Sequence, residues 1–183
     1  MAVSALPGVF HADRRRIIIA IAGECNDTDD QNAMASKVVY FGPGVKNNLV
    51  QILEIDGVIH TSVYAELKAC EAALCRVWWA VIKPEGIRKL HRLCITVVIK
   101  TSSGSLFRAM TEQVFQWEVN KWKFENGQPV EHVSMFKRLH DQVRILNRLG
   151  MEVLFWLVSE EKNRVAQELA EQKLYQEFPF VFP

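Results

Sequence analysis

The stretch from Arg15 to Cys25, RRIIIAIAGEC, decides the fold class of this chain. Its isoleucine and alanine residues follow one another without polar alternation, which is typical of a strand buried on both faces rather than of one with a wet side. The run ends at Gly23, and a polar loop follows from Asn26 to Asn32. Residues 15–25 therefore predict a buried strand.

Two shorter strand patterns follow the first strand closely. Residues 38–41 (VVYF) stop at Gly42-Pro43-Gly44, and residues 49–55 (LVQILEI) form the next apolar run. Glycine and proline end regular structure, and short connections join neighbouring antiparallel strands. These three strands predict an antiparallel meander. Later in the chain, residues 93–99 (LCITVVI) predict an interior strand, and residues 151–158 (MEVLFWLV) predict a fifth.

Helical periodicity fills most of the remaining chain. Apolar residues recur at helical spacing from Ser62 to Trp79. Further helices are expected over 103–122, either continuous or broken in two, over 134–149 and over 160–175. Gly150 stands where a helix C-terminus favours glycine. Three strands followed by helix, strand, two helices, strand and helix predict a mixed-sheet α/β domain.

The composition fits one domain. Its charge balance argues against a protein that binds nucleic acid mainly through an excess of basic residues. The chain has 183 residues, is 49% hydrophobic, and carries 22 basic and 21 acidic residues. Proteins that live on nucleic acid usually show a basic excess or a dense basic stripe. The only compact cationic run is Arg14-Arg15-Arg16, which we interpret as a solvated strand entry rather than a phosphate-binding patch.

Cysteine usage and hydropathy indicate the compartment. Four cysteines (Cys25, Cys70, Cys75 and Cys94) show no CxxC pair and no metal-like spacing, so buried free thiols of a reducing compartment are expected. No apolar stretch is long enough to span a membrane, and the N-terminus lacks the order of a signal peptide. We expect an intracellular protein, cytoplasmic or nuclear.

Five motifs occur in a fixed order along the chain. They are Ala22-Gly23-Glu24-Cys25, TSVYAELKA at 61–69, IKTSS at 99–103, WEVNKW at 117–122 with Pro129-Val130, and MEVLFWLVSEEKNRVAQELA at 151–170. In this order they resemble the ribonuclease H family, in particular its fungal members, over about residues 15–175. The resemblance implies a ribonuclease-H-like mixed five-stranded sheet, with three antiparallel strands, parallel additions and flanking helices. It also implies a domain over 15–176 between an extension at 1–14 and an apolar tail at 177–183.

The resemblance also implies a metal-dependent active site whose ligands this chain has largely lost. Ribonucleases H use four carboxylates to hold two divalent metals, since closely spaced dications need several negative charges. At the matching positions this sequence has Ala22, Glu66, Ser102 and Gln167. The mobile histidine of many members matches Ser159 or Glu160. One carboxylate of four remains, so we expect a pseudoenzyme without a metal cofactor.

In the alternative, the protein is an active or weakly active nuclease whose magnesium ions are held by acids at other positions. Glu24 lies two residues beyond Ala22, Glu171 one helical turn beyond Gln167, and Asp27, Asp29 and Asp30 lie in the loop after the first strand. Solvated surface acids are the preferred interpretation of all five. Lys100 is a further candidate, because an ammonium two residues before Ser102 could neutralise Glu66 in place of metal.

The family's substrate-reading positions have changed too. Val63-Tyr64 replaces Asn-Arg, Gly104 replaces Gln, and His132 to Met135 replaces the family's N-x-D-L. Four candidates for nucleic-acid contact persist: Trp117, Asn120, Lys121 and Trp122. The two tryptophans are expected to be core anchors rather than stacking platforms. Arg108, Lys121 and Lys123 provide few charges for phosphate contacts.

The sequence therefore predicts a non-catalytic scaffold or regulatory module that interacts with a protein partner or with itself. Residual binding of RNA–DNA hybrids is one use open to it, and an active or weakly active hybrid nuclease is the alternative. The apolar end of the chain, FPFVFP at 178–183, is expected either to fold back or to dock on a partner. Of Trp78 and Trp79, one ring is expected in the core and the other at the surface.

Overall fold

The protein is built on one five-stranded mixed sheet. The computed structural model describes residues 16–26, 33–54, 60–83, 86 and 95–177. The sheet order is β3-β2-β1-β4-β5, with β1 (Arg16–Cys25), β2 (Ala35–Tyr40) and β3 (Leu49–Ile52) antiparallel. The two later strands, β4 (Ile95–Thr101) and β5 (Met151–Leu157), run parallel to β1. The predicted fold class is confirmed.

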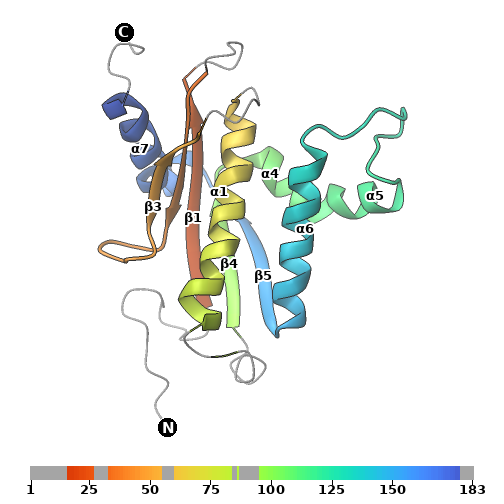
Figure 1. The fold of residues 1–183 in the computed structure, drawn as a ribbon, viewed down its shortest axis with the longest axis horizontal. Coiled ribbons are helices and arrows are strands. Elements are labelled where there is room, and N and C mark those ends of the chain that lie inside the picture. The colour runs from red at the N-terminus through yellow and green to blue at the C-terminus, as the bar shows by residue number, and fades with distance from the viewer. Residues whose placement is uncertain (1–15, 27–32, 55–59, 84–85, 87–94, 178–183) are drawn as a thin grey trace.

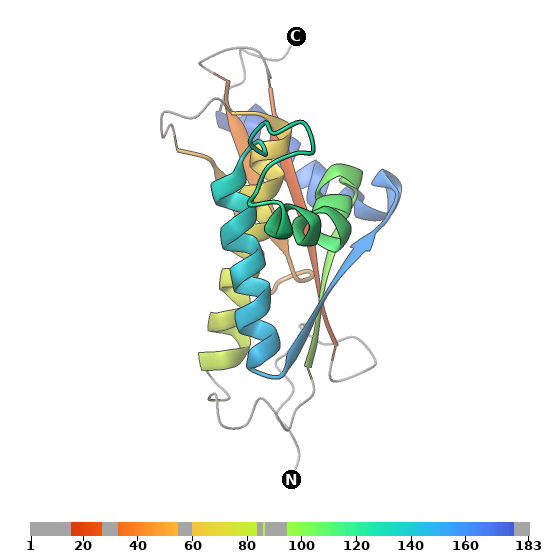
Figure 2. The same ribbon diagram turned by 90° about the vertical axis from the view of Figure 1, so that its right-hand side faces the viewer.

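Helices cover both faces of the sheet (Figure 1). On one face lie α1 (Ser62–Val77), which continues into the π-helical turn η1 (Trp78–Ile82), and α6 (Val133–Arg148). The opposite face carries α7 (Glu160–Glu177), which packs on β1, β2 and β3, and Figure 2 shows α6 and α7 on opposite sides. The expected helix over 103–122 consists of α4 (Gly104–Arg108), the π-helical turn η2 (Ala109–Gln113) and α5 (Val114–Val119).

Local sequence explains where the helices begin and end. The Thr61 hydroxyl accepts a hydrogen bond from the Tyr64 amide at 3.1 Å and so caps α1, as threonine does at many helix N-termini. Ser103 caps α4 in the same way through the Leu106 amide. Gly150, which follows the end of α6, has a φ of 82°, a left-handed conformation that glycine adopts at little cost.

Gly23 allows α1 to cross β1 at backbone distance. A Cβ atom at position 23 would lie 2.2 Å from the Glu66 amide nitrogen and 2.3 Å from the Ala65 carbonyl carbon. Both are backbone atoms of α1, so no side-chain rotation could relieve the clash. The strand and the helix therefore pack in this way only because residue 23 has no side chain.

The core lies on both sides of the sheet but is very unequal. The larger cluster joins the isoleucines of β1 to α1, β4 and α6, with Ile17, Ile19, Ile21 and Ile99 almost fully buried. On the α7 side, a small cluster forms from Ala20, Ala22, Val38, Ala166 and Ala170. Small residues here let α7 approach the sheet closely.

Several predictions about single residues need correction. Trp78 and Trp79 are 40% and 59% exposed, so neither ring is a core residue. The π-helical turn η1 begins at Trp78 and carries both rings outside the buried stripe of α1. Cys70 is buried as expected, whereas the free thiol of Cys75 is exposed.

Other predictions fall on parts of the chain outside the described residues. These are the 1–14 extension, Arg14 and Arg15, the loop acids at 27–30, Cys94 and the tail at 178–183. Arg16 is exposed at the start of β1, and α7 continues to Glu177, the first residue of the predicted tail. Within the described residues, no helix combines the length and apolar character needed to cross a membrane.

Replacing Gly23 by alanine should destabilise the whole domain. The methyl group would overlap the α1 backbone, and such overpacking should lower the free energy of unfolding by about 3 kcal/mol or more. For a domain of this size, that corresponds to a fall in Tm of roughly 10 °C, measurable by circular dichroism. Gly104→Ala is the matched control, because the nearest atom to its Cβ is a flexible arginine tip at 3.7 Å. Equal Tm values for the two variants would contradict the packing argument.

Candidate functional site

The four positions singled out in the sequence meet in one pocket. A cavity of about 180 Å³ is lined by Ala22, Glu66, Ser102 and Gln167 together with Ile21, Gly23, Glu24, Ser62, Thr101 and Glu160. These residues come from β1, α1, the end of β4 and α7. Residues up to 145 positions apart in the sequence (22 and 167) thus share one depression. The expected convergence is confirmed in the structure.

Sheet topology and one amide hold the pocket together. Strands β1 and β4 are parallel neighbours, so their carboxyl ends lie at the same edge of the sheet. Asn163 of α7 is buried, and its amide donates to the Ile21 carbonyl at 2.9 Å and to the Ser102 hydroxyl at 3.3 Å. Asn163 therefore fixes α7 to the ends of β1 and β4. The sequence analysis did not single it out, although it belongs to the motif at 151–170.

Glu66 is the remaining carboxylate of the expected four, and it accepts a hydrogen bond from a serine. The Ser103 hydroxyl donates to Glu66 Oε2 at 2.5 Å and lies 2.9 Å from the Ser105 hydroxyl. Burial raises the pKa of Glu66 from 4.5 to about 7; the bond from Ser103 opposes this rise, and the charge of Glu24 adds to it. Without a cation, Glu66 is therefore only partly ionised at neutral pH. Ser103 is a site residue that the sequence analysis missed, because the family motif directed attention to Ser102.

Two further acids lie at the pocket. Glu24 and Glu160 both line it, although solvated surface positions were preferred for Glu24. Burial raises the pKa of Glu24, and the nearby charges of Glu171 and Glu160 raise it further. The carboxylates of the region therefore repel one another. Asp27, Asp29 and Asp30 lie outside the described residues.

The donor set does not fit a two-metal centre. Among the described residues, no three His, Cys, Asp or Glu side chains are grouped so that they could hold a metal ion. The other three family positions offer a methyl group, a hydroxyl and a neutral amide, whereas magnesium favours charged oxygen ligands in octahedral geometry. Lys100 is not among the residues lining the pocket, and the lowering of its pKa arises from burial. The structure therefore gives no support to neutralisation of Glu66 by Lys100.

The four candidates for nucleic-acid contact lie in and after α5. Trp117 is buried against Phe136 and Phe124, as expected of a core anchor. The Asn120 amide donates to the backbone carbonyls of Lys123 and Phe124, which closes the turn after α5.

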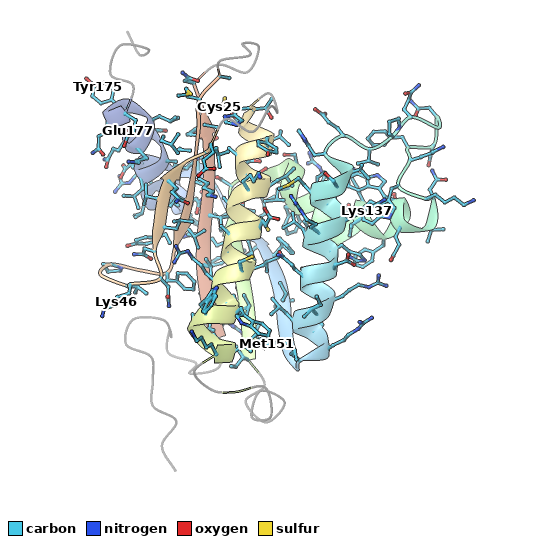
Figure 3. The ribbon with its side chains drawn as sticks, in the orientation of Figure 1. Cys25, Lys46, Lys137, Met151, Tyr175 and Glu177 are labelled. Atoms are coloured by element: carbon cyan, nitrogen blue, oxygen red, sulfur yellow. The ribbon has the colours of Figure 1, made fainter. Side chains whose placement is uncertain are left out.

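Lys121 and Trp122 continue that turn in left-handed backbone conformation, with φ of 54° and 64°. The Lys137 ammonium lies 5.4 Å from the centre of the Trp122 ring, and Figure 3 shows Lys137 on the side of α6 that faces this turn. Trp122 and Asn120 therefore already have structural contacts within the domain.

The sheet order, the flanking helices and the convergent pocket define the class of protein: a ribonuclease-H-like α/β domain. Solved structures agree with this assignment. LC11-RNase H1, isolated from compost by a metagenomic approach, aligns with a TM-score of 0.58 at 17% identity, over 90% of this chain and 99% of that chain. The native protease–reverse transcriptase of prototype foamy virus gives a TM-score of 0.58 at 20% identity, over 86% of this chain and 20% of that chain. At such identities the likeness shows the fold.

Sequence similarity points to the same family. Over 59 residues the chain is 36% identical to Ribonuclease H of Bordetella pertussis, a match that covers 32% of this chain and 37% of that protein. Ribonuclease H of Bordetella avium is 37% identical over 59 residues, which cover 32% of this chain and 38% of that protein. The match thus spans well under half of these relatives. No family model matches the chain. The resemblance to ribonuclease H is confirmed in fold and in part of the sequence, and its fungal character stays a prediction.

The raised pKa of Glu66 predicts a specific pH dependence of stability. The folded protein keeps the Glu66 proton up to about pH 7, whereas the unfolded chain releases it near 4.5. The free energy of unfolding should therefore fall as pH rises through this window and stay lower above it. Glu66→Gln should abolish this contribution, so the variant should gain on the order of 2 kcal/mol relative to the natural chain between pH 5 and pH 8.

Urea denaturation at a series of pH values measures this difference. Glu161→Gln, at an exposed position on α7, is the matched control and should follow the natural chain. A constant offset between Glu66→Gln and the natural chain across pH would show that Glu66 ionises normally.

Proposed function

We propose that this chain is a ribonuclease-H-like domain without two-metal nuclease activity, acting as a protein-interaction or regulatory module. One observation carries the proposal: the pocket that gathers the four family positions contains a carboxylate at only one of them, Glu66. Stabilising the charge that develops during phosphodiester cleavage is the main task of such a centre. A pocket that cannot concentrate divalent cations loses most of that stabilisation.

The electrostatics of the pocket support the same proposal. A metal ligand has to be ionised, and burial with a neighbouring acid raises the pKa of Glu66 to about 7. The Ser103 hydroxyl donates to one oxygen of this half-buried carboxylate, so Glu66 has a hydrogen-bond partner without a cation.

A second part of the proposal concerns nucleic-acid binding. LC11-RNase H1 has been solved in complex with an RNA/DNA hybrid, and so has the foamy viral protease–reverse transcriptase. For this chain we propose weak binding of hybrids at most, because its formal net charge is only +1 and Asn120 and Trp122 already have internal contacts.

Exposed apolar surface supports the interaction role. Trp78, Trp79 and Ile145 line a hollow of about 300 Å³ between the end of α1 and α6, and each is at least 40% exposed. Lys83 lies 4.5 Å from the centre of the Trp79 ring. Aromatic side chains are over-represented at protein interfaces, and tryptophan is among the residues that most often contribute strongly to binding energy there.

The second candidate is a nuclease with relocated ligands, and the position of Glu24 and Glu160 favours it. Both acids line the same pocket as Glu66, although among the described residues no three acids are grouped closely enough to hold a metal ion as they stand. In this alternative, magnesium would offset the burial and the mutual repulsion that raise the pKa values of Glu24 and Glu66.

The decisive experiment is a cleavage assay on a labelled RNA–DNA hybrid with magnesium or manganese. The natural chain should not cleave it. A chain that cleaves, and loses cleavage in the double variant Glu24→Gln/Glu160→Gln, would establish the relocated-ligand alternative.

A restoration variant tests whether only the ligands are missing. Combining Ala22→Asp, Ser102→Asp and Gln167→Asp should lower apo stability, because like charges crowd the pocket and Ala22 is packed among small apolar residues. Magnesium should then raise the Tm of the variant by linkage, according to RT ln(1 + [L]/Kd), and leave the natural chain unchanged. Asparagine at the same three positions is the uncharged control. Equal stabilisation of the natural chain by magnesium would refute the loss of the metal centre.

A further inference from the structure

Two lysines converge on a second pocket, on the α1 side of the sheet. The cavity of about 250 Å³ is lined by Lys37, Gln51, Ile52, Leu53, Glu54 and Lys68. Lys37 comes from β2, Gln51 and Ile52 from β3, and Lys68 from α1. The pocket therefore forms only when the strand edge and the helix are assembled, and it is separate from the residues that line the family pocket.

Strand register explains why Lys37 faces the helix. Gly23 of β1 pairs with Lys37 of β2, and Lys37 pairs with Gln51 of β3, so the three residues form one row across the sheet. Side chains in such a row point to the same face. The row lies where α1 touches Gly23, which places Lys37 beside the helix turn that carries Lys68.

The two ammonium groups interact unfavourably. Burial lowers the pKa of Lys37, and the neighbouring charges of Lys68 and Arg76 lower it further. Glu71 and Glu54 act in the opposite direction, but the Glu71 carboxylate is also engaged by Arg138 at 3.2 Å. Among the described residues, the Lys37 side chain has neither a hydrogen bond nor a short ion pair, whereas the Lys68 ammonium lies 5.1 Å from the centre of the Tyr64 ring. A half-buried cation beside a like charge gains most from an anion.

We propose that Lys37 and Lys68 form a binding site for a phosphate group. Two ammonium donors and the Gln51 amide can give charge-assisted and neutral hydrogen bonds to three phosphate oxygens. A water molecule takes about 30 Å³ of liquid volume, so the cavity has room for a phosphate with part of its hydration shell. Glu54 also lines the pocket, and its carboxylate opposes the attraction of the two lysines for an anion.

The ligand is either free phosphate or a phosphate of a nucleic-acid backbone, and these share the same chemistry. The site does not depend on the proposed loss of nuclease activity, because it uses neither Glu66 nor any of the other three family positions. Its test therefore fails or succeeds independently of the cleavage assay.

The first arm of the test titrates inorganic phosphate into the ¹⁵N-labelled full chain at constant ionic strength, since salt screens exposed charges. The amide signals of residues 51–54 and 68 should shift and saturate. Lys37→Gln and Lys68→Gln should each raise the phosphate Kd about tenfold, the loss expected from removing one charged donor. The same spectra show whether each variant is folded.

Lys46→Gln is the control of equal charge change. Lys46 is exposed in the connection between β2 and β3, and Figure 3 shows it at the tip of that connection, away from α1. The control should bind phosphate like the natural chain. Shifts that do not saturate, or equal weakening by Lys46→Gln and Lys37→Gln, would overturn the proposal.

The second arm identifies the source of the phosphate by fluorescence anisotropy with a labelled oligothymidine. Weaker binding by Lys37→Gln than by Lys46→Gln assigns the pocket to backbone phosphates. Equal oligonucleotide binding by the two variants, together with a saturable phosphate site, assigns it to the free anion. If the natural chain shows neither saturable amide shifts with phosphate nor binding of the oligothymidine, the proposed site is refuted.

Discussion

The contact between Gly23 and the backbone of α1 is the constraint on which the rest of the structure depends. The missing side chain lets the helix lie directly on the central strand, and this contact fixes the height and rotation of α1. The Glu66 amide nitrogen lies 2.2 Å from where a Cβ atom of residue 23 would be, and the Glu66 carboxylate lines the pocket at the ends of β1 and β4. Two residues further along the helix, Lys68 is brought against the neighbouring strand. One glycine thus positions both pockets.

Hydrogen bonds between separate elements hold together the pocket lined by Ala22, Glu66, Ser102 and Gln167. Its buried acid is met by a serine hydroxyl, and α7 is held to β1 by the amide of Asn163. Hydrogen bonds of this kind are directional and uncharged on the donor side, so they tolerate an environment in which a dense carboxylate cluster would be unstable. The pocket gathers side chains from several elements, and burial raises the pKa values of two of its acids, Glu66 and Glu24.

The sequence was sufficient to predict the sheet, the order of the helices and the convergence of four distant positions. Continuous apolar runs indicated β1 and β4, and the collinear motifs singled out Ala22, Glu66, Ser102 and Gln167, which line one pocket in the structure. Ser103 and Asn163 were missed because their roles arise from hydrogen bonds between separate elements, which no local pattern encodes. The exposure of Trp78 and Trp79 depends on a π-helical turn that shifts the helical phase, and periodicity assumes an unbroken helix. The pairing of Lys37 with Lys68 depends on strand register.

The small apolar cluster beneath α7 bears on how this domain could change over evolutionary time. Ala22 packs there with Ala166 and Ala170, so the helix rests on methyl groups where the family places a charged ligand. In the proposed pseudoenzyme, a return of aspartate at position 22 alone would bury a carboxylate without a cation to compensate it. If the proposed loss of the metal centre is right, a single aspartate restored at one of these positions would destabilise the domain without creating a metal site. Recovery of the centre would then require several substitutions together.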